Sequence, residues 1–467
     1  MTLYNTLSRH VLAPSFDLIR GARTMKCLTE LEESQWWPRE RIEELQAERL
    51  QRLIRYAYDR VPYYRRVMNE RGLRPADIQS AADLAKLPVL TKDLVRANFD
   101  DMRAEGYPRS ELLPGRTGGS TGEPLLFYGT KSAMYDGGYA VGLRSMGWAG
   151  LRLGDRSVAI CGVRRPETAW ERTLLRLSLS LQQIIRVDAK SISEATLPGI
   201  VQMLHRVHPR AFGGYPSVTA HVASFIKDSG QLAPPVHSVV TGGEQLFEHQ
   251  RELIREVFHS EPYSRYGSNE AYEMAAECAE HSGLHVHAEG IIAEVVDDGG
   301  NLALPGQQGH ILVTSLLNYG MPFIRYENGD DGSLATSSCP CGRGLPLLGT
   351  LLGRTSDFVY TPSGRRVAGT SLPSSRLAAL GVVQYQLVQE AIGRVVMRVV
   401  LPSVTEPDAQ AEVGRRIEAL YRGHLGDDMR IEVKFTDHIE PTAAGKYVPV
   451  VSRVDPNSWL GQKERQL

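Results

Sequence analysis

The sequence predicts an α/β protein with a large N-terminal domain and a small C-terminal α+β domain. Between about 112 and 350, short apolar runs of strand length alternate with longer stretches of helical periodicity, which is typical of α/β folds. The region before this one shows helical periodicity only, and the character changes again after Gly353-Arg354. The expected domains are residues 1–355, of which 1–110 are mainly helical, and residues 356–467.

The opening region contains two predicted helices. Residues 39–60 place apolar side chains mostly three or four positions apart, which predicts an amphipathic helix. Pro62 then interrupts the pattern. A shorter helix is predicted from Lys92 to Asn98, with Thr91 as its N-cap. We find no catalytic motif in this region.

The central region supplies strands and helices in alternation. The predicted strands are Ser157–Ile160, Val236–Val240, Ile291–Val296 and His310–Thr314, and the predicted helices are 193–206, 217–228 and 247–258. Glycine-rich segments separate strands from helices, where ligands of open α/β sheets usually bind. The C-terminal region adds strands at Phe358–Tyr360, Val382–Val388, Val395–Leu401 and Ile431–Phe435, and one helix at about 405–423.

Composition excludes several classes of protein. The 467 residues include 53 Lys+Arg and 54 Asp+Glu, and this near balance argues against a dedicated nucleic-acid-binding protein. Five cysteines are too few, and odd in number, for a secreted disulfide scaffold. No segment approaches the ~18 apolar residues of a membrane helix, and the N-terminus lacks signal-peptide features. We expect a cytoplasmic protein with no membrane span.

Six short segments carry candidate chemistry. Glycines let the backbone approach a ligand, and exposed amides with Ser/Thr hydroxyls can hold phosphate oxygens. A lysine on a small glycine-bearing loop suits negative charge that develops on phosphate. Each segment alone is more often a structural loop, so the prediction depends on their order. The segments are Arg116–Pro124, Val240–Glu244, Ser264–Glu270, Ile324–Asp330, Gly353–Asp357 and Ile439–Lys446.

In this order, the six segments resemble those of the adenylate-forming ligase superfamily, which includes acyl-CoA synthetases, luciferases and peptide-synthetase adenylation domains. The resemblance spans about 112–450. Other segments resemble the phenylacetate–CoA ligase branch, and within it the capsular-polysaccharide (CapK-like) and coenzyme F390 synthetase-like members. These segments are Arg55-Tyr56-Ala57-Tyr58, Val61-Pro62-Tyr63-Tyr64, Leu84–Leu90 and Gly213–Ser217.

The resemblance implies a fold and a function. The fold is a large adenylate-forming domain, with mixed sheets and a small β subdomain, followed by a small mobile domain that carries the adenylation lysine. The function is an AMP-forming ligase, which converts an organic acid and ATP to an acyl-adenylate and passes the acyl group to CoA.

The resemblance also implies roles for individual residues. Pyrophosphate would be held by Thr117, Gly118, Gly119, Ser120, Thr121 and Gly122, and the adenine pocket would be lined by Gly242, Gly243 and Glu244. Tyr266 would stack on adenine, within the segment that includes Gly267, Ser268 and Asn269, and Glu270 would hold Mg²⁺. Asp330 and Arg354 would bind the ribose, and Lys446 would bridge the acid and the α-phosphate. The acid pocket would include Tyr135, Gly138, Tyr139, Phe212, Gly213 and Tyr215.

The sequence departs from its relatives at several positions. Gly118 replaces a usual serine, Ser356 replaces the usual hinge aspartate, and Asn269 replaces a threonine. Asparagine can still donate and accept hydrogen bonds, so we expect adenylation to survive. Residues 361–372 lack the glycine-asparagine loop that shapes the pantetheine tunnel of phenylacetate–CoA ligases. This difference favours an amine or hydroxyl acceptor, whereas the branch as a whole favours CoA.

The cysteines suggest a zinc site. Cys339 and Cys341 flank one proline, and Cys278 lies upstream beside three histidines. Zinc prefers four Cys and His ligands, often paired on two turns, so we expect a closed structural site. The fourth ligand is predicted to be His285, which lies in a segment that resembles zinc-bearing relatives, with His281 as the alternative.

Two questions stay open at this level. A non-catalytic nucleotide-binding protein on the same fold is an alternative, although Glu270, Asp330, Arg354 and Lys446 are all present. The identity of the acid and the oligomeric state, for which a homodimer is one option, are not predicted.

Overall fold

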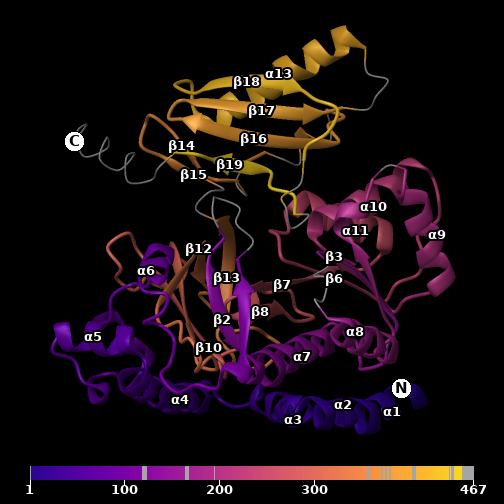
Figure 1. Ribbon diagram of the computed structural model, residues 1–467. Helices are drawn as coiled ribbons and strands as arrows, with labels where there is room; N and C mark the ends of the chain where they lie inside the picture. Colours follow the sequence, from indigo (N-terminus) through magenta and orange to yellow (C-terminus); the bar gives the residue numbers. More distant parts are fainter. Residues whose placement is uncertain are drawn as a thin grey trace. The chain divides into compact units, whose positions relative to one another are not determined.

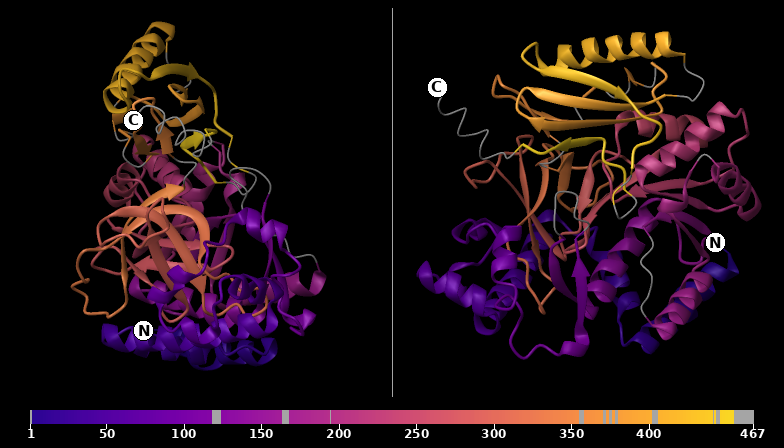
Figure 2. Two further views of the ribbon diagram at one scale, coloured as in Figure 1. Left: turned by 90° about the vertical axis from the view of Figure 1, so that its left-hand side faces the viewer. Right: turned by 45° about the horizontal axis from the view of Figure 1, so that its top comes forward.

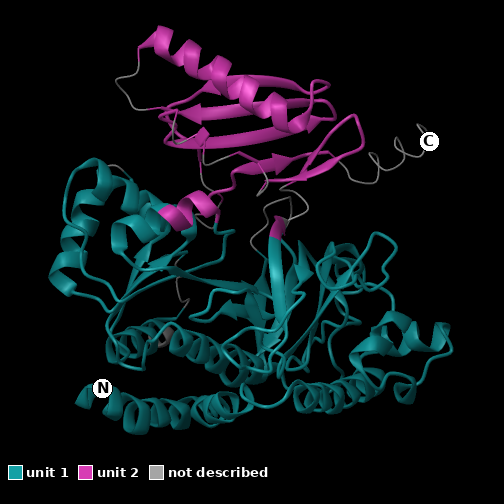
Figure 3. Cartoon of the chain, turned by 180° about the vertical axis from the view of Figure 1, so that it is seen from behind, with its two compact units in different colours: residues 1–246, 253–351 teal, residues 247–252, 352–467 magenta. Residues whose placement is uncertain are grey.

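A computed structural model gives the fold of the chain. It describes residues 2–117, 124–162, 168–193, 195–354, 358–369, 372–373, 376–377, 380–401, 406–440, 442 and 446–454. The chain forms two compact units (Figure 3). Unit 1 comprises residues 1–246 and 253–351, and unit 2 comprises 247–252 and 352–467. The predicted fold class is confirmed, because helices combine with several mixed sheets. The predicted domain boundary at 355/356 stays a prediction.

Unit 1 begins with a series of helices (Figure 1). They are α1 (Leu3–Leu7), η1 (Ser8–Leu12), α2 (Ala13–Arg20), α3 (Thr24–Ser34), α4 (Arg39–Arg60), α5 (Pro62–Glu70), η2 (Pro75–Asp77), η3 (Ala81–Lys86), α6 (Lys92–Ala97) and η4 (Arg109–Glu111). The predictions for α4 and α6 are confirmed, and the Thr91 hydroxyl accepts from the Leu94 amide at 3.3 Å as the expected N-cap. Pro62 ends one helix and starts the next, because proline is tolerated at the first helical position.

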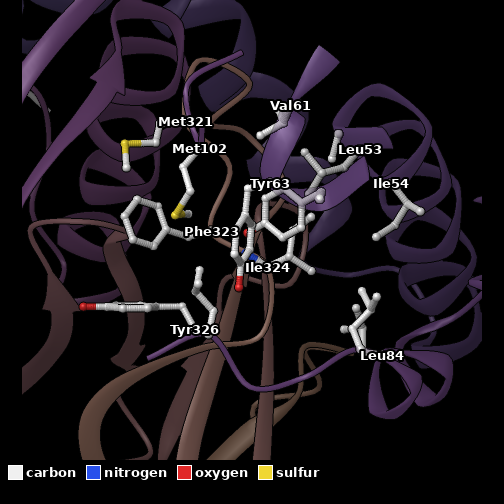
Figure 4. Close-up of a cluster of buried hydrophobic side chains, with 14 of the residues drawn as sticks. Leu53, Ile54, Val61, Tyr63, Leu84, Met102, Met321, Phe323, Ile324 and Tyr326 are labelled. Atoms are coloured by element: carbon white, nitrogen blue, oxygen red, sulfur yellow. The ribbon is translucent and has the colours of Figure 1, made fainter. Parts of the chain in front are cut away.

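The helices α4 and α5 bury their apolar faces against the part of the main sheet that contains β10 and β12. Leu53, Ile54 and Val61 share one core cluster with Phe323 and Tyr326 (Figure 4). The Tyr64 hydroxyl donates to the Pro322 carbonyl and accepts from the Ile324 amide, both at 3.0 Å. This core therefore positions the chain just before segment 324–330.

An eleven-stranded sheet forms the centre of unit 1, in the order β10-β11-β12-β13-β9-β8-β7-β6-β5-β3-β4. Its strands are β3 (Ser157–Cys161), β4 (Ile184–Asp188), β5 (Ala211–Gly214), β6 (Ser238–Gly242), β7 (Pro262–Ser268), β8 (Tyr272–Glu277), β9 (Leu284–Val286), β10 (Ile291–Val296), β11 (Gln308–Ser315), β12 (Tyr326–Leu334) and β13 (Leu347–Arg354). A separate hairpin joins β1 (Leu112–Arg116) to β2 (Leu126–Thr130). The four predicted central strands are confirmed as β3, β6, β10 and β11.

The strands from β3 to β7 are parallel, in the order β4-β3-β5-β6-β7. The chain passes from β3 to one neighbour, β4, and then returns to the other, β5. In such sheets ligands bind beyond the carboxyl ends of the strands where the order reverses. This places the expected crevice beside Gly162 and Tyr215, which follow β3 and β5.

Helices cover this parallel part of the sheet. They are η5 (Ala133–Tyr139), α7 (Ala140–Trp148), α8 (Ala169–Leu181), η6 (Ala189–Ser191), α9 (Leu197–Val207), α10 (Pro216–Asp228) and α11 (Glu248–Phe258). Apolar residues of α9, α10 and α11 form one core with strands β3, β5 and β6. The three predicted helices are confirmed, with α9 beginning four residues later than predicted.

Unit 2 is a small α+β structure. A four-stranded sheet has the order β18-β17-β16-β19, and helix α13 (Pro407–Leu425) lies across one of its faces (Figure 2). The strands are β16 (Gln384–Ala391), β17 (Arg394–Val400), β18 (Arg430–Phe435) and β19 (Val450–Ser452), beside a hairpin of β14 (Phe358–Tyr360) and β15 (Arg366–Ala368). Buried Tyr421 and Leu425 of α13 pack with Val395 and Met397 of the sheet. These elements confirm the predicted strands and helix of the C-terminal region.

Across the parts of the chain that the structure describes, no helix combines the length and the apolar character needed to cross a bilayer.

Candidate functional site

The third and fourth predicted segments meet through direct hydrogen bonds. The Tyr266 hydroxyl, on β7, donates to Asp330 Oδ2 on β12 at 2.8 Å. Asn328 Nδ2 donates to the Tyr266 hydroxyl at 2.7 Å and to Asp330 Oδ2 at 2.8 Å. The predicted adenine-stacking ring and the predicted ribose acceptor are therefore neighbours, and Asn328 holds both of them.

Glu270 lies in the tight turn between β7 and β8. Its side chain is buried, and its Oε1 accepts from the hydroxyl of Tyr326 at 2.9 Å. The Ser268 hydroxyl accepts from the Ala271 amide at 3.1 Å, which closes the turn. Tyr272 follows with φ of +59°, a left-handed backbone that costs energy for a residue with a side chain and is found most often near functional sites. The turn thus holds the Glu270 carboxylate in one place.

The base of the glycine-rich loop is joined to this turn. Thr117 and Leu125 close the loop, because the Thr117 amide donates to the Leu125 carbonyl at 2.9 Å and the Leu125 amide donates to the Thr117 hydroxyl at 2.8 Å. Asn269 Nδ2 donates to the Arg116 carbonyl at 2.8 Å. The loop residues Gly118, Gly119, Ser120, Thr121 and Gly122 lie outside the described residues. The side-chain amide of Asn269 therefore connects the two segments.

The second segment ends β6 beside the same strand. A Cβ on Gly242 would lie 3.0 Å from the Arg265 carbonyl, so the close approach of β6 and β7 at this point favours glycine. Gly243 has φ of +81°, which is also a glycine conformation. Glu244 Oε2 accepts from the Ser217 amide at 3.2 Å, at the start of α10. This segment therefore turns towards α10 next to Tyr266.

The predicted acid-pocket residues occupy two places. Tyr135, Gly138 and Tyr139 lie on η5, a π-helical stretch of a kind that is often found at functional sites. A Cβ on Gly138 would lie 2.8 Å from Tyr272, so η5 packs tightly against the strand that follows Glu270. The Tyr139 hydroxyl donates to the side-chain carbonyl of Gln182, the residue that follows α8.

The other acid-pocket residues belong to β5 and its end. The Tyr215 hydroxyl accepts from the Gly162 amide at 3.1 Å, which places the ring at the reversal point of the sheet. The Phe212 ring is buried against Phe258, with centroids 5.3 Å apart, in the core beneath the helices. Gly213 lies against β6, because a Cβ there would lie 1.9 Å from the Val240 carbonyl.

Electrostatics relate the two places. Burial raises the pKa of Tyr139, and Arg20 and Arg186 oppose this shift. Burial also raises the pKa of the Cys161 thiol, again with Arg186 opposing. The charge of Arg186, on β4, therefore acts on both Tyr139 of η5 and Cys161 at the end of β3.

The remaining predicted residues belong to unit 2. Lys446 begins the last described stretch before β19, and its amide donates to the Thr442 hydroxyl at 3.1 Å. The Thr442 amide in turn donates to the Lys446 carbonyl at 2.8 Å. Arg354 is the last residue of β13.

Four cysteine and histidine side chains meet in unit 1. The ligand atoms of Cys278, His285, Cys339 and Cys341 all lie within 4.8 Å of one another. Cys278 Sγ lies 3.6 Å from Cys339 Sγ, and His285 Nε2 lies 3.3 Å from Cys341 Sγ. In a tetrahedral zinc site, bonds of ~2.0–2.3 Å separate the ligand atoms by about 3.5–3.8 Å. The four side chains therefore fit a zinc ion, in the arrangement predicted with His285.

The surroundings favour the metal-binding protonation state of His285 and Cys341, whereas burial raises the pKa of Cys278 and of Cys339. Burial, with a contribution from Arg343, lowers the pKa of His285 to about 4, so its imidazole is neutral at pH 7. Burial raises the pKa of Cys341, but hydrogen bonds from Arg343 more than offset it and lower the pKa below its usual value. His281, the alternative ligand, lies outside the group, with its Nδ1 3.2 Å from Glu277 Oε2.

Sequence reasoning missed three residues of the candidate site. Asn328 and Tyr326 lie within a predicted segment but received no role, and Tyr272 was not considered. The Asn-Gly-Asp spacing of 328–330 was a usable signal, because a short amide side chain can bond two residues onward. The Tyr326–Glu270 contact joins positions 56 residues apart, and no local pattern predicts it.

Comparisons with known proteins agree with the resemblance found in the sequence. The chain is 28% identical to a phenylacetate-coenzyme A ligase of Thermus thermophilus over 430 residues, covering 88% of this chain and 93% of that protein. It is 22% identical to Protein CapK of Staphylococcus aureus, covering 86% and 87% of the two chains. No protein-family model matches the chain.

Solved structures agree with the fold. 2-Hydroxyisobutyryl-CoA ligase in complex with 2-HIB-AMP, in the postadenylation state, matches with a TM-score of 0.74 at 20% identity, over 93% of this chain and 94% of that one. The same ligase with 2-HIB-AMP and CoA matches with a TM-score of 0.62 at 22% identity. The chain is thus a relative of the phenylacetate–CoA ligase branch of the adenylate-forming ligases.

Proposed function

We propose that the protein is an AMP-forming acid–CoA ligase. The observation that carries this proposal is the convergence of Tyr266, Asn328, Asp330 and the Glu270 turn in unit 1. An aromatic ring beside a ribose acceptor, with a buried carboxylate nearby, suits a nucleotide and its metal ion. The curated relatives named phenylacetate-coenzyme A ligase support the same activity.

The first step joins the acid to AMP. A carboxylate oxygen of the acid attacks the α-phosphorus of ATP, the bond to the β-phosphate oxygen breaks, and pyrophosphate leaves. Two anions must approach each other, so most of the catalytic help comes from positioning and from placed positive charge. We assign this positive charge to Lys446 and to the backbone amides of residues 117–122. Asp330 and Tyr266 would orient the nucleoside.

We assign magnesium binding to Glu270. Tyr326 donates to one oxygen of this buried carboxylate, and the other oxygen would act as one protein ligand of the ion. Mg²⁺ is commonly held by one or two carboxylates together with substrate phosphates. The ion would neutralise charge on the phosphates when ATP is bound.

The second step transfers the acyl group. The CoA thiol gives up its proton and its sulfur attacks the acyl carbon. The bond between this carbon and the phosphate oxygen breaks, and AMP leaves. Supplying purified protein with ATP, Mg²⁺, a panel of organic acids and CoA is expected to give an acyl-CoA and one AMP per thioester, identified by mass. A wild-type protein that releases no AMP with any acid of a broad panel would contradict the proposal.

A different acceptor is the second candidate. Residues 361–372 lack the glycine-asparagine loop of phenylacetate–CoA ligases, and this observation favours an amine or hydroxyl. In the same assay, an adenylate that forms but reacts with added amines or sugars and leaves CoA untouched would favour an amide or ester synthetase. Retention of ATP without turnover of any acid would favour a non-catalytic homologue.

We also propose that Cys278, His285, Cys339 and Cys341 hold one structural zinc ion. Elemental analysis is expected to find about one zinc per chain, and Cys341→Ser to lose it. Because a tightly bound ion stabilises the folded state by mass action, the loss is expected to lower the thermal midpoint by about 5–10 °C.

The matched control is Cys161→Ser, since Cys161 is also partly buried but lies outside the cluster. It is expected to keep its zinc and its thermal midpoint. A wild-type protein that contains no metal and is not stabilised by added zinc would refute the site. The cytoplasmic location and a homodimer stay predictions.

A further inference from the structure

A chain of polar side chains runs through unit 1 from the surroundings of the cysteine cluster to strand β7. Its members are Arg144 of α7, Glu289 and His287 after β9, Glu273 of β8 and Arg265 of β7. The side chains of Arg144, Glu289 and His287 are 1–2% exposed, and that of Glu273 is 9% exposed. Buried charges cost free energy unless they are paired, so these contacts constrain the structure tightly.

The contacts of Arg144 determine which nitrogen of His287 carries a proton. Arg144 donates to both oxygens of Glu289, at 2.6 and 3.0 Å, and its Nη2 lies 2.8 Å from His287 Nδ1. A guanidinium group can only donate, so Nδ1 must be the acceptor and Nε2 must carry the proton. Nε2 lies 3.3 Å from Glu273 Oε1 and 3.3 Å from the Ser145 hydroxyl, so these two oxygens share its proton. Glu273 therefore receives a directed hydrogen bond from a ring that cannot change its tautomer without losing Arg144.

At the other end of this series of polar contacts, Glu273 holds Arg265. Glu273 Oε2 accepts from Arg265 Nε at 2.7 Å and from its Nη2. Burial would raise the pKa of Glu273, but Arg265 and His287 more than offset this and lower the pKa to about 2. Both oxygens of a charged carboxylate are thus occupied by donors, which a neutral side chain could not reproduce.

This pair straddles an irregularity in the sheet. On β7 and β8, Arg265 pairs with Ala276 and Tyr266 pairs with Ala275, but Gly267 pairs with Glu273, so the register shifts between Tyr266 and Gly267. Arg265 lies before the shift and Glu273 lies after it. Bulges of this kind re-aim side chains, and the backbone ladder is weaker where they occur. The ion pair bridges the gap in the ladder.

We propose that Glu273 is a positioning residue that holds Arg265 across this bulge and so aims Tyr266 at the nucleotide. Tyr266 follows Arg265 directly, and its hydroxyl bonds Asp330. A change in the bulge would therefore disturb the ring and its ribose-binding partner together. The proposal rests on the proposed function only for the identity of the ligand, since the geometry itself needs none.

Glu273→Gln tests the proposal, because glutamine keeps the shape of the side chain but has only one acceptor oxygen. Its NH₂ group would face a donor, either Arg265 or His287, in place of the second oxygen. The dissociation constant for Mg·ATP, measured by calorimetry, is expected to rise about tenfold. KM for ATP is also expected to rise, while kcat stays within about twofold of the wild-type value. Amide hydrogen exchange of the peptides that cover 262–268 is expected to accelerate without any ligand. Arg265→Lys, which keeps the charge but not the two-nitrogen contact, is expected to give a smaller change in the same direction.

Asp155→Asn is the matched control. This carboxylate is 14% exposed and likewise pairs with an arginine, with its Oδ2 3.3 Å from Arg210 Nε, but it lies just before β3 and outside this series of polar contacts. It is expected to lower thermal stability while the ATP dissociation constant stays within about twofold.

Exchange in 262–268 that is unchanged in both Glu273→Gln and Arg265→Lys would overturn the proposal, as would an equal loss of ATP affinity in Asp155→Asn. If the wild type itself does not bind ATP, the proposed function fails, and the exchange measurement on ligand-free protein still decides the positioning role.

Discussion

Lys446→Ala is expected to reduce acid-dependent adenylation by roughly 10²–10³-fold, with little effect on folding. The expectation follows from charge, because the attacking carboxylate and the α-phosphate are both anionic, and removing one placed donor from such a site costs about this factor. Both hydrogen bonds between Lys446 and Thr442 use backbone atoms of the lysine, which meet the hydroxyl and the amide of the threonine. The substitution therefore removes the ammonium group and leaves these bonds in place.

The matched control is Lys434→Ala in the same unit. Lys434 lies on β18 with its side chain 57% exposed and 3.1 Å from Glu432, an arrangement that contributes little to stability. Its variant is expected to keep full adenylation activity. The rate of the first turnover with saturating acid and ATP measures both variants. Equal rates in Lys446→Ala and the wild type would remove Lys446 from the mechanism.

Glu270→Gln is expected to lower adenylation by about 10²-fold and to raise the Mg²⁺ concentration needed for half-maximal rate. Glutamine can still accept from the Tyr326 hydroxyl, so the turn between β7 and β8 is expected to survive. The lost charge is the change that matters, because Mg²⁺ prefers charged carboxylate oxygens. A magnesium titration of the rate separates this effect from a loss of ATP affinity.

Glu256→Gln serves as the control for Glu270. Glu256 of α11 is exposed and pairs with Lys227 at 2.7 Å, and it belongs to none of the six predicted segments. Its variant is expected to behave as the wild type in the same titration. If Glu270→Gln and Glu256→Gln have the same magnesium requirement, the assignment of Glu270 is wrong.

The sequence predicted those elements whose own residues determine them. Helix α4 spans Arg39–Arg60, as its apolar periodicity indicates, and β10 spans Ile291–Val296, a continuous apolar run. Strand β7 is different, because Pro-Tyr-Ser-Arg-Tyr-Gly-Ser has few apolar residues and no alternation. It is a strand because β6 and β8 flank it, and that information comes from distant parts of the chain.

The candidate site divides in the same way. The residue types of the loops were visible in the sequence, because glycines, hydroxyls and acids stand at ligand-binding positions. Their partners were not, since the contacts of Asn328 with Tyr266 and of Glu273 with Arg265 depend on strand pairing and on the bulge after Tyr266. The grouping of His285 with the three cysteines likewise depends on β9 lying beside β8 and β13.

Acid-dependent exchange of labelled pyrophosphate into ATP tests the central claim most directly, because it reports the adenylation step without any acceptor. We predict exchange by the wild-type protein with at least one member of a broad panel of organic acids, dependent on Mg²⁺ and lost in Lys446→Ala. Exchange that no acid supports, in folded protein that contains its metal, would contradict the assignment of this chain as an adenylate-forming ligase.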